Sequence, residues 1–374
     1  MGAGIAGTAL YEMLLARRSG VWEPAHASAK ALASRPVTAN PSSAGLYYGA
    51  PAVAYVLQAS GNPAYAPTLD AMDHQVATLV DRRLSAAYAR MASGRPARLR
   101  EFDLISGLTG IGAYLLRRNS TSLLQQVLSY LVRLITEPVT VDGYAVPGWW
   151  ASDSPRGRYD EAWPLGHANF GLAHGIAGPL ALLGLSHRAG VTVAGADEAL
   201  DEGCHVLTRW ARPLRGGGTG WPETLGLVPY LRGPLIEVRP GRPSWCYGTP
   251  GIARSLQLVA QAGNNKTAQH FAEQTFLSCL TDSRQLSRIR DTTVCHGWAG
   301  LLLSADRVAA DACLDGFDRE LVRLHSQLSD CIVRHEIPEG PGLLTGADGV
   351  LLTLHTLSPS RPLDPTWQTC LLLS

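Results

Sequence analysis

Two kinds of apolar segment alternate along the chain. In "LQQVLSYLVRLI" (124–135) and "DEALDEGCHVLTRWAR" (197–212), apolar residues recur near spacings of three and four, which predicts amphipathic helices with one buried face. Other segments, such as "GLTGIGAYLL" (107–116), are apolar almost all round, as a fully buried helix is. The pattern therefore predicts an all-α fold in which buried helices alternate with half-exposed ones.

Each fully apolar segment opens with two small residues separated by two positions. This arrangement occurs seven times, with first and second residues Gly4/Gly7, Gly49/Ala52, Gly107/Gly110, Gly175/Gly178, Gly248/Gly251, Gly297/Gly300 and Gly346/Gly349. Successive pairs are 45 to 73 residues apart, which leaves room for the buried helix, a turn and a second helix running back. The chain is therefore predicted to be an internal repeat of a two-helix unit.

The glycines favour one arrangement of these units. A glycine inside a helix costs roughly 1 kcal/mol relative to alanine, so its recurrence indicates that backbone approaches backbone closely at these points. Helix pairs of this kind can stack into an open solenoid or close into a ring with buried helices inside. We favour the ring, an α/α toroid of about seven helical hairpins with inner and outer helix rings, because only closure brings distant repeats to a common centre.

The ends of the chain complicate this picture. We expect residues 1–374 to form one toroid domain, but the first repeat begins at Gly4 and leaves no residues for an outer helix ahead of it. Either the final segment fills that place in the outer ring, or the chain starts late relative to similar proteins.

Composition narrows the class of protein. Hydrophobic residues make up 46% of the chain and the net charge is +1, as in a soluble, core-forming protein. No block of basic residues suits nucleic acid, and no apolar run reaches the ~18–20 residues of a membrane span. The start lacks the features of a secretory signal, so the cytoplasm is the expected location. Seven scattered cysteines indicate free or metal-bound thiols better than a disulfide framework.

Aligning the repeats on the first small residue selects three residues that could bind a metal. Cys246 and Cys295 both lie two positions before it, in the fifth and sixth repeats, and His296 lies one before it. In a closed ring these positions are neighbours, so the three side chains should converge. Two thiolates and an imidazole suit Zn²⁺, and three protein ligands leave the fourth position open, as in catalytic sites. The alternative is two ordinary buried thiols beside an ordinary imidazole.

Three further polar residues lie near the repeat starts. His174 directly precedes the first glycine of the fourth repeat, Asp103 lies four residues before Gly107, and Arg242 lies four before Cys246. Each also has a structural interpretation. His174 could form a hydrogen bond in the core, Asp103 could cap a helix, and Arg242 could belong to an exposed loop.

Several blocks of the sequence resemble the lanthionine synthetase C-like family, the lanthipeptide cyclases. They are "FDLISGLTGIGAYLL", "GHANFGLAHGIAGPLALL", "RPSWCYGTPG", "CHGWAGLL" and the terminal "LLTGADGVLLTLHTL". The resemblance runs from Gly4 to Ser374 and is greatest to the single-domain bacterial cyclases. The departures are the late start and Ala52, which stands where the other repeats have glycine.

The resemblance implies an α/α toroid with a central zinc ion held by Cys246, Cys295 and His296. It also implies functional roles for Asp103, His174, Arg242 and Tyr247. The implied activity is addition of a peptide cysteine thiol to dehydroalanine or dehydrobutyrine of the same peptide, which forms a thioether ring. We expect His174 to act as general acid oriented by Asp103. Arg242 would stabilise the enolate, and Tyr247 would assist proton transfer or line the cavity.

The implied partners are a dehydrated precursor peptide and a lanthipeptide dehydratase. A non-catalytic zinc-bearing scaffold that binds thiols or peptides is the alternative function. It needs only the three ligands, so the presence of all four further residues speaks against it. A glycan-processing toroid would need paired carboxylates across a cleft, and the repeat starts offer only Asp103 and Asp348.

Overall fold

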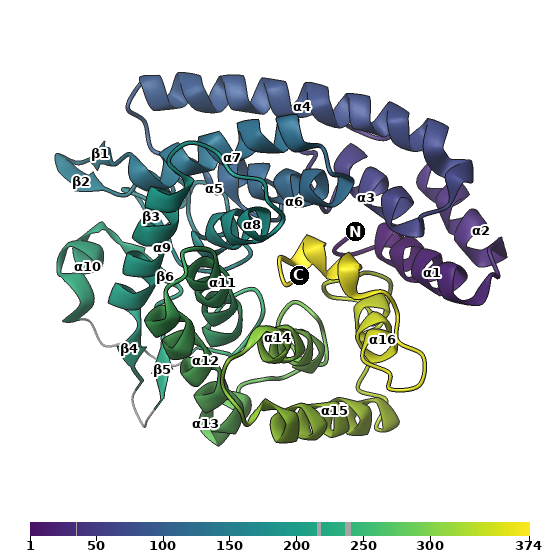
Figure 1. Cartoon of the computed structure of the whole chain (residues 1–374). Helices are drawn as coiled ribbons and strands as arrows, with labels where there is room; N and C mark the ends of the chain where they lie inside the picture. The colour runs from purple at the N-terminus through teal and green to yellow at the C-terminus, as the bar shows by residue number, and fades with distance from the viewer. Residues whose placement is uncertain (35, 215–217, 236–240) are drawn as a thin grey trace.

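The seven apolar segments surround a common axis in a computed structural model that describes residues 1–374 apart from 35, 215–217 and 236–240 (Figure 1). Each inner helix contacts the next one along the chain, and the last contacts the first, so the ring is closed and the toroid prediction is confirmed. The inner helices are α1 (Ile5–Ser19), α3 (Ala50–Ser60), α6 (Leu108–Arg118), α8 (Ala177–Arg188), α11 (Thr249–Ala262), α14 (Trp298–Asp311) and α16 (Ala347–Thr356).

Six helices of the described part of the chain lie outside the ring, each packed on the inner helix that precedes it. They are α2 (Glu23–Leu32), α4 (Ala66–Ala92), α7 (Thr121–Thr136), α9 (Ala196–Trp210), α12 (Lys266–Thr281) and α15 (Phe317–Val333). The two amphipathic segments predicted from spacing correspond to α7 and α9. Among the described residues, no helix combines the length and the apolar character that crossing a bilayer requires.

The chain's final segment does not fill a place in the outer ring, and that part of the prediction is wrong. In the described part of the chain, α16 has no outer helix after it. The short helix η3 (Pro365–Leu371) instead turns into the centre of the ring (Figure 1). There the Tyr47 hydroxyl donates to the carbonyl of Cys370 (2.6 Å), and Nε1 of Trp245 donates to that of Leu371 (2.9 Å). The terminal apolar residues thus form part of the core along the ring axis.

Short strands and helices, which the sequence pattern did not predict, fill the connections. In the segments that the structure describes, three antiparallel pairs form: β1 (Val139–Val141) with β2 (Tyr144–Val146), β3 (His167–Asn169) with β6 (Thr224–Gly226), and β4 (Arg212–Pro213) with β5 (Thr219–Gly220). The remaining elements are α5 (Leu99–Phe102), α10 (Leu227–Leu231), α13 (Ser283–Leu286), η1 (Pro63–Tyr65) and η2 (Gly233–Leu235). The hairpin β1–β2, α10 and the pair β4–β5 lie together on one side of the ring (Figure 1).

Close backbone packing explains the second glycine in the pairs that have one. A Cβ atom on Gly251 would lie 2.1 Å from the carbonyl oxygen of Trp245, and one on Gly300 would lie 1.9 Å from that of Val294. Both partners are six residues earlier, because the loop before each inner helix crosses that helix's first turn. Crossing loops of this kind bring the residues before the first glycine to one end of the ring, where the predicted site residues lie.

Candidate metal centre and active site

A belt of main-chain hydrogen bonds joins equivalent residues of successive repeats. The N–H of Ala173 donates to the carbonyl of Cys246 (3.2 Å), and that of Cys246 donates to the carbonyl of Cys295 (3.2 Å). The belt continues from Cys295 N–H to the Leu344 carbonyl (2.8 Å) and from Leu344 N–H to the Gly2 carbonyl (2.8 Å). All five residues lie two positions before the first small residue of their repeats. Residues that share this position in the sequence repeat are therefore hydrogen-bonded neighbours in the fold.

The belt brings the three predicted ligands together. One ligand atom from each of Cys246, Cys295 and His296 lies within 4.8 Å of the others. Cys246 is buried, whereas Cys295 and His296 are half-buried. Both cysteines precede an inner helix, α11 or α14, whose first residue follows the repeat glycine. The three residues could therefore hold a metal ion at the end of the ring.

The acid–base properties of the two thiols fit a cation. A hydrogen bond from Cys295 lowers the pKa of Cys246 well below 9, with burial opposing this shift and His296 reinforcing it. The same hydrogen bond, burial and the negative charge of Cys246 raise the pKa of Cys295. The pair of thiols therefore loses its first proton readily and its second proton with difficulty. A divalent cation between the sulfurs would stabilise both thiolates, so the donor set suits a metal ion such as zinc.

Asp103 and His174 form a second unit beside this cluster. A hydrogen bond of 2.6 Å joins Nδ1 of His174 to Oδ2 of Asp103. The other carboxylate oxygen of Asp103 accepts the N–H groups of Ser106 (2.7 Å) and Gly107 (2.8 Å). Asp103 thus shapes the loop that leads into α6 and holds an imidazole as well, but it does not cap the helix itself, whose N-cap residue is Gly107, so the capping interpretation is wrong. Its side chain is 3% exposed, whereas that of His174 is 34% exposed.

The environment favours a protonated His174. Burial lowers its pKa, but the hydrogen bond and the charge of Asp103, with a further contribution from the Cys246 thiolate, outweigh burial and raise the pKa above 6.5. The site thus combines a proton donor with candidate metal ligands.

Tyr247 and Arg242 complete the predicted set. The Tyr247 hydroxyl accepts a hydrogen bond from Nδ2 of Asn169 (3.0 Å), and its ring centroid lies 6.3 Å from that of His174. Burial raises the pKa of Tyr247, so the phenol stays neutral. Arg242 is 39% exposed, and its Nη1 lies 3.9 Å from Oδ2 of Asp291. All seven predicted residues therefore lie at the same end of the ring.

Three polar residues of the site were not singled out from sequence. Asn169 contacts Tyr247, and Asp291 lies between Arg242 and His296, with its Oδ2 at 3.4 Å from Nε2 of His296. Both lie six residues before their repeat glycine, a register position from which sequence alignment could have found them. Glu223 has no such signal, because it lies in the connection after β5. Burial and the nearby Cys246 charge raise the pKa of Glu223.

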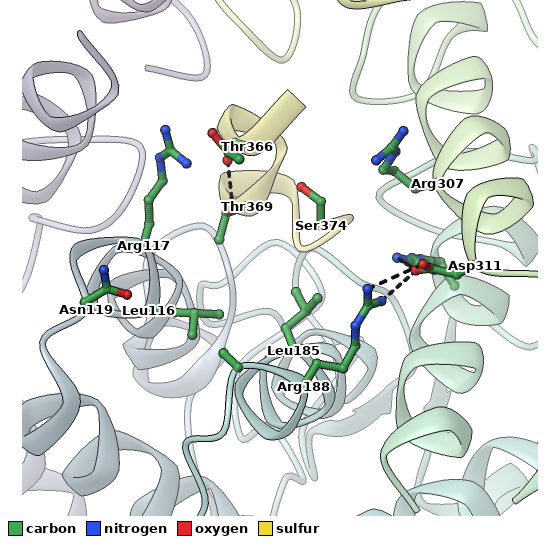
Figure 2. Close-up of a pocket in the computed structure, with 12 residues that line it drawn as sticks. Leu116, Arg117, Asn119, Leu185, Arg188, Arg307, Asp311, Thr366, Thr369 and Ser374 are labelled. Carbon is green, nitrogen blue, oxygen red and sulfur yellow. Dashed lines mark hydrogen bonds and ion pairs between the residues drawn. The ribbon is translucent and has the colours of Figure 1, made fainter. Parts of the chain in front are cut away.

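Cavities lie at both ends of the ring. A groove of about 660 Å³ beside the Cys/His cluster is lined by His296, Asp291, Trp298 and residues of the connection between α15 and α16. A second cavity of about 380 Å³ lies at the opposite end, where η3 meets the last turns of α6, α8 and α14 (Figure 2). Its lining includes Arg117 and an ion pair between Arg188 and Asp311, and none of the predicted site residues.

Comparisons with known proteins agree with the fold. A family model described as lanthionine synthetase C-like protein matches residues 1–372. The nisin biosynthesis protein NisC of Lactococcus lactis subsp. lactis is 26% identical over 278 residues, which are 73% of this chain. That alignment spans 64% of NisC, less than two thirds of its length. The solved structure of a nisin cyclase superposes with a TM-score of 0.80 at 22% identity, covering 100% of this chain and 91% of the other.

Proposed function

This chain belongs to the family of lanthionine synthetase C-like proteins, and we propose that it is a zinc-dependent lanthipeptide cyclase. The substrate is a dehydrated precursor peptide. In the reaction, a cysteine sulfur of the peptide bonds to the β-carbon of a dehydroalanine or dehydrobutyrine. The thiol gives up its proton, and the electrons of the carbon–carbon double bond move toward the neighbouring carbonyl, which gives an enolate. The α-carbon then takes up a proton. The product is a lanthionine or methyllanthionine ring, with no net oxidation or reduction.

Cys246, Cys295 and His296 are the residues that would hold the zinc ion. Zinc bound there would supply positive charge and an open coordination position, at which a thiol loses its proton at neutral pH. Because two of the three ligands are thiolates, the set favours delivery of a sulfur nucleophile over activation of water.

The remaining residues handle the charge and the proton. His174, whose pKa Asp103 raises, gives its proton to the α-carbon as general acid. The guanidinium of Arg242 stabilises the negative charge that develops on the enolate oxygen. The ring of Tyr247 lies near that of His174, with 6.3 Å between the two centroids, and its neutral hydroxyl assists the proton transfer.

The proposal extends to the protein's surroundings. Residues 1–374 act as one cyclase domain in the cytoplasm, where the thiols stay reduced. The precursor reaches the cyclase after a lanthipeptide dehydratase has acted on its serine and threonine residues.

The 2.6 Å hydrogen bond between Asp103 and His174, beside the Cys/His cluster, is the observation that carries this proposal. A scaffold that only bound zinc and thiols would have no use for a positioned acid. The experiment is to mix the zinc-loaded protein with a dehydrated precursor, such as dehydrated nisin precursor, and count free peptide thiols by alkylation and mass spectrometry.

We expect the parent protein to consume thiols without a change in peptide mass. His174→Asn should slow this loss by about 100-fold or more, the usual contribution of a general acid, at unchanged zinc content. Binding of the peptide without loss of free thiols would favour the scaffold instead. Normal rates for His174→Asn at full zinc occupancy would show that the acid role is wrong.

A further inference from the structure

Asn169 and Asp291 occupy the same position in two different repeats. Asn169 lies six residues before Gly175 in the fourth repeat, and Asp291 lies six residues before Gly297 in the sixth. In both, Oδ1 accepts the main-chain N–H two residues further along, from Gly171 at 3.0 Å and from Thr293 at 2.9 Å. The two side chains therefore shape equivalent loops in the same way.

The main-chain contacts of the two residues also match. The carbonyl of Asn169 accepts the N–H of Ile176 (2.9 Å), and that of Asp291 accepts the N–H of Trp298 (3.1 Å), in each case seven residues on. The repeat glycine lies against the side chain. A Cβ atom on Gly175 would be 2.5 Å from Oδ1 of Asn169, and one on Gly297 would be 2.4 Å from Oδ1 of Asp291. Each loop thus fixes its Asx side chain through one oxygen.

The second side-chain atom differs in chemistry, and in both residues it faces the site. Nδ2 of Asn169 donates to the hydroxyl of Tyr247 at 3.0 Å. Oδ2 of Asp291 lies 3.4 Å from Nε2 of His296 and 3.9 Å from Nη1 of Arg242. The same repeat position therefore carries an amide that donates to the phenol of Tyr247 in one repeat. In the other repeat it carries a carboxylate near the imidazole of His296.

We propose that Asn169 and Asp291 are paired positioning residues, built at one repeat position, that orient Tyr247 and His296 respectively. The choice of amide or carboxylate follows from what each partner must do. The amide nitrogen can only donate, so the phenol oxygen accepts and its own proton stays available for donation to another group. The carboxylate can only accept, so it favours the tautomer in which Nε2 of His296 carries the proton and Nδ1 has the lone pair available for a metal ion.

The role of Asp291 is tested with zinc alone, without any peptide. Asp291→Asn keeps the oxygen that accepts from Thr293 but turns an amide N–H toward His296, which favours the wrong tautomer. Zinc affinity, measured by competition with a chromophoric chelator, should fall about 10- to 100-fold, as is usual when such a carboxylate is lost. Asp330→Asn, an exposed aspartate on α15, is the matched control and should keep the parent affinity within about twofold, as expected for a surface change.

Asp291→Ser separates loss of the contact with His296 from disruption of the loop. A serine hydroxyl can still accept the loop N–H, but it does not reach His296. It should weaken zinc binding as much as Asp291→Asn while the melting temperature stays near that of the parent. Parent zinc affinity in either folded Asp291 variant would overturn the assignment.

The role of Asn169 rests on the proposed cyclase activity and is tested separately. Asn169→Ser keeps the loop hydrogen bond and removes the donor to Tyr247. It should lower kcat for a dehydrated precursor with KM and zinc affinity unchanged. The double variant with Tyr247→Phe should then be no slower than Tyr247→Phe alone, because both changes remove the same oriented proton.

Additive losses in the double variant would overturn the role of Asn169. If the parent protein cyclises nothing, the proposed function fails, and the zinc measurements on the Asp291 variants still decide the other half of the pair.

Discussion

The main-chain N–H of Cys246 donates a 3.2 Å hydrogen bond to the main-chain carbonyl of Cys295, although 48 residues lie between them in the sequence. This bond is one link of the belt that joins equivalent positions of neighbouring repeats. It places the two thiols side by side through the backbone, independently of any ion. The candidate metal site is therefore a consequence of ring closure.

The pH dependence of turnover should report the Asp103–His174 pair. A general acid must be protonated, so kcat should fall as pH rises through the pKa of His174, which Asp103 raises above 6.5. Asp103→Asn removes the charge that raises this pKa, so the falling limb of the pH–kcat profile should move to lower pH. A limb that stayed in place in Asp103→Asn would show that another group limits the reaction.

A buried histidine away from the site should make the fold sensitive to acid. His167 is fully buried, its Nδ1 lies 2.9 Å from the carbonyl of Asp153, and burial lowers its pKa from 6.5 to about 4. The unfolded chain therefore binds this proton more readily, and stability is lost as pH falls from about 6.5 toward 4.

The loss from this residue should be about 3 kcal/mol between pH 7 and pH 4. Urea unfolding at several pH values measures it. His167→Asn, whose amide can still donate to the Asp153 carbonyl, should be less stable at pH 7 but show a shallower pH dependence. An unchanged slope in the variant would rule out His167 as the source.

The terminal segment should stabilise the whole ring from its axis. Trp245→Phe removes the indole donor to the Leu371 carbonyl in a fully buried place. The free energy of unfolding should fall by about 2 kcal/mol from the lost hydrogen bond and volume together. Trp22→Phe is the control, because Trp22 is half-buried and its indole N–H has no hydrogen-bond partner in the described part of the chain. Equal stability of the two variants in denaturant titrations would count against the role of the terminal segment.

Sequence predicted the ring and the convergence of Cys246, Cys295 and His296 because both depend on one strongly constrained feature, the repeat glycine. Once Gly248 and Gly297 are aligned, Cys246 and Cys295 lie at the same repeat position, and closure of the ring makes these two positions neighbours. The pairing of Asp103 with His174 was predictable in part. Asp103 lies just before a helix, as a capping residue would. Its partner His174 belongs to the next repeat, so the sequence around Asp103 does not indicate the pairing.

The features that the sequence did not predict have physical reasons as well. The segment after α16 is apolar and short, and such a pattern does not distinguish packing on the outside of the ring from insertion along its axis. Asn169 and Asp291 lie in loops, where Asx residues usually signal turns alone. Their second function depends on which atom faces the centre, and only the folded loop determines this.

Zinc content tests the central claim most directly. The account expects about one zinc ion per chain in the parent protein after dialysis, measured by plasma mass spectrometry, and almost none in Cys246→Ala and Cys295→Ala. Cys313→Ala, at an exposed cysteine outside the cluster, should keep the parent content. Full zinc occupancy in both Cys246→Ala and Cys295→Ala would contradict the site on which the proposed chemistry depends.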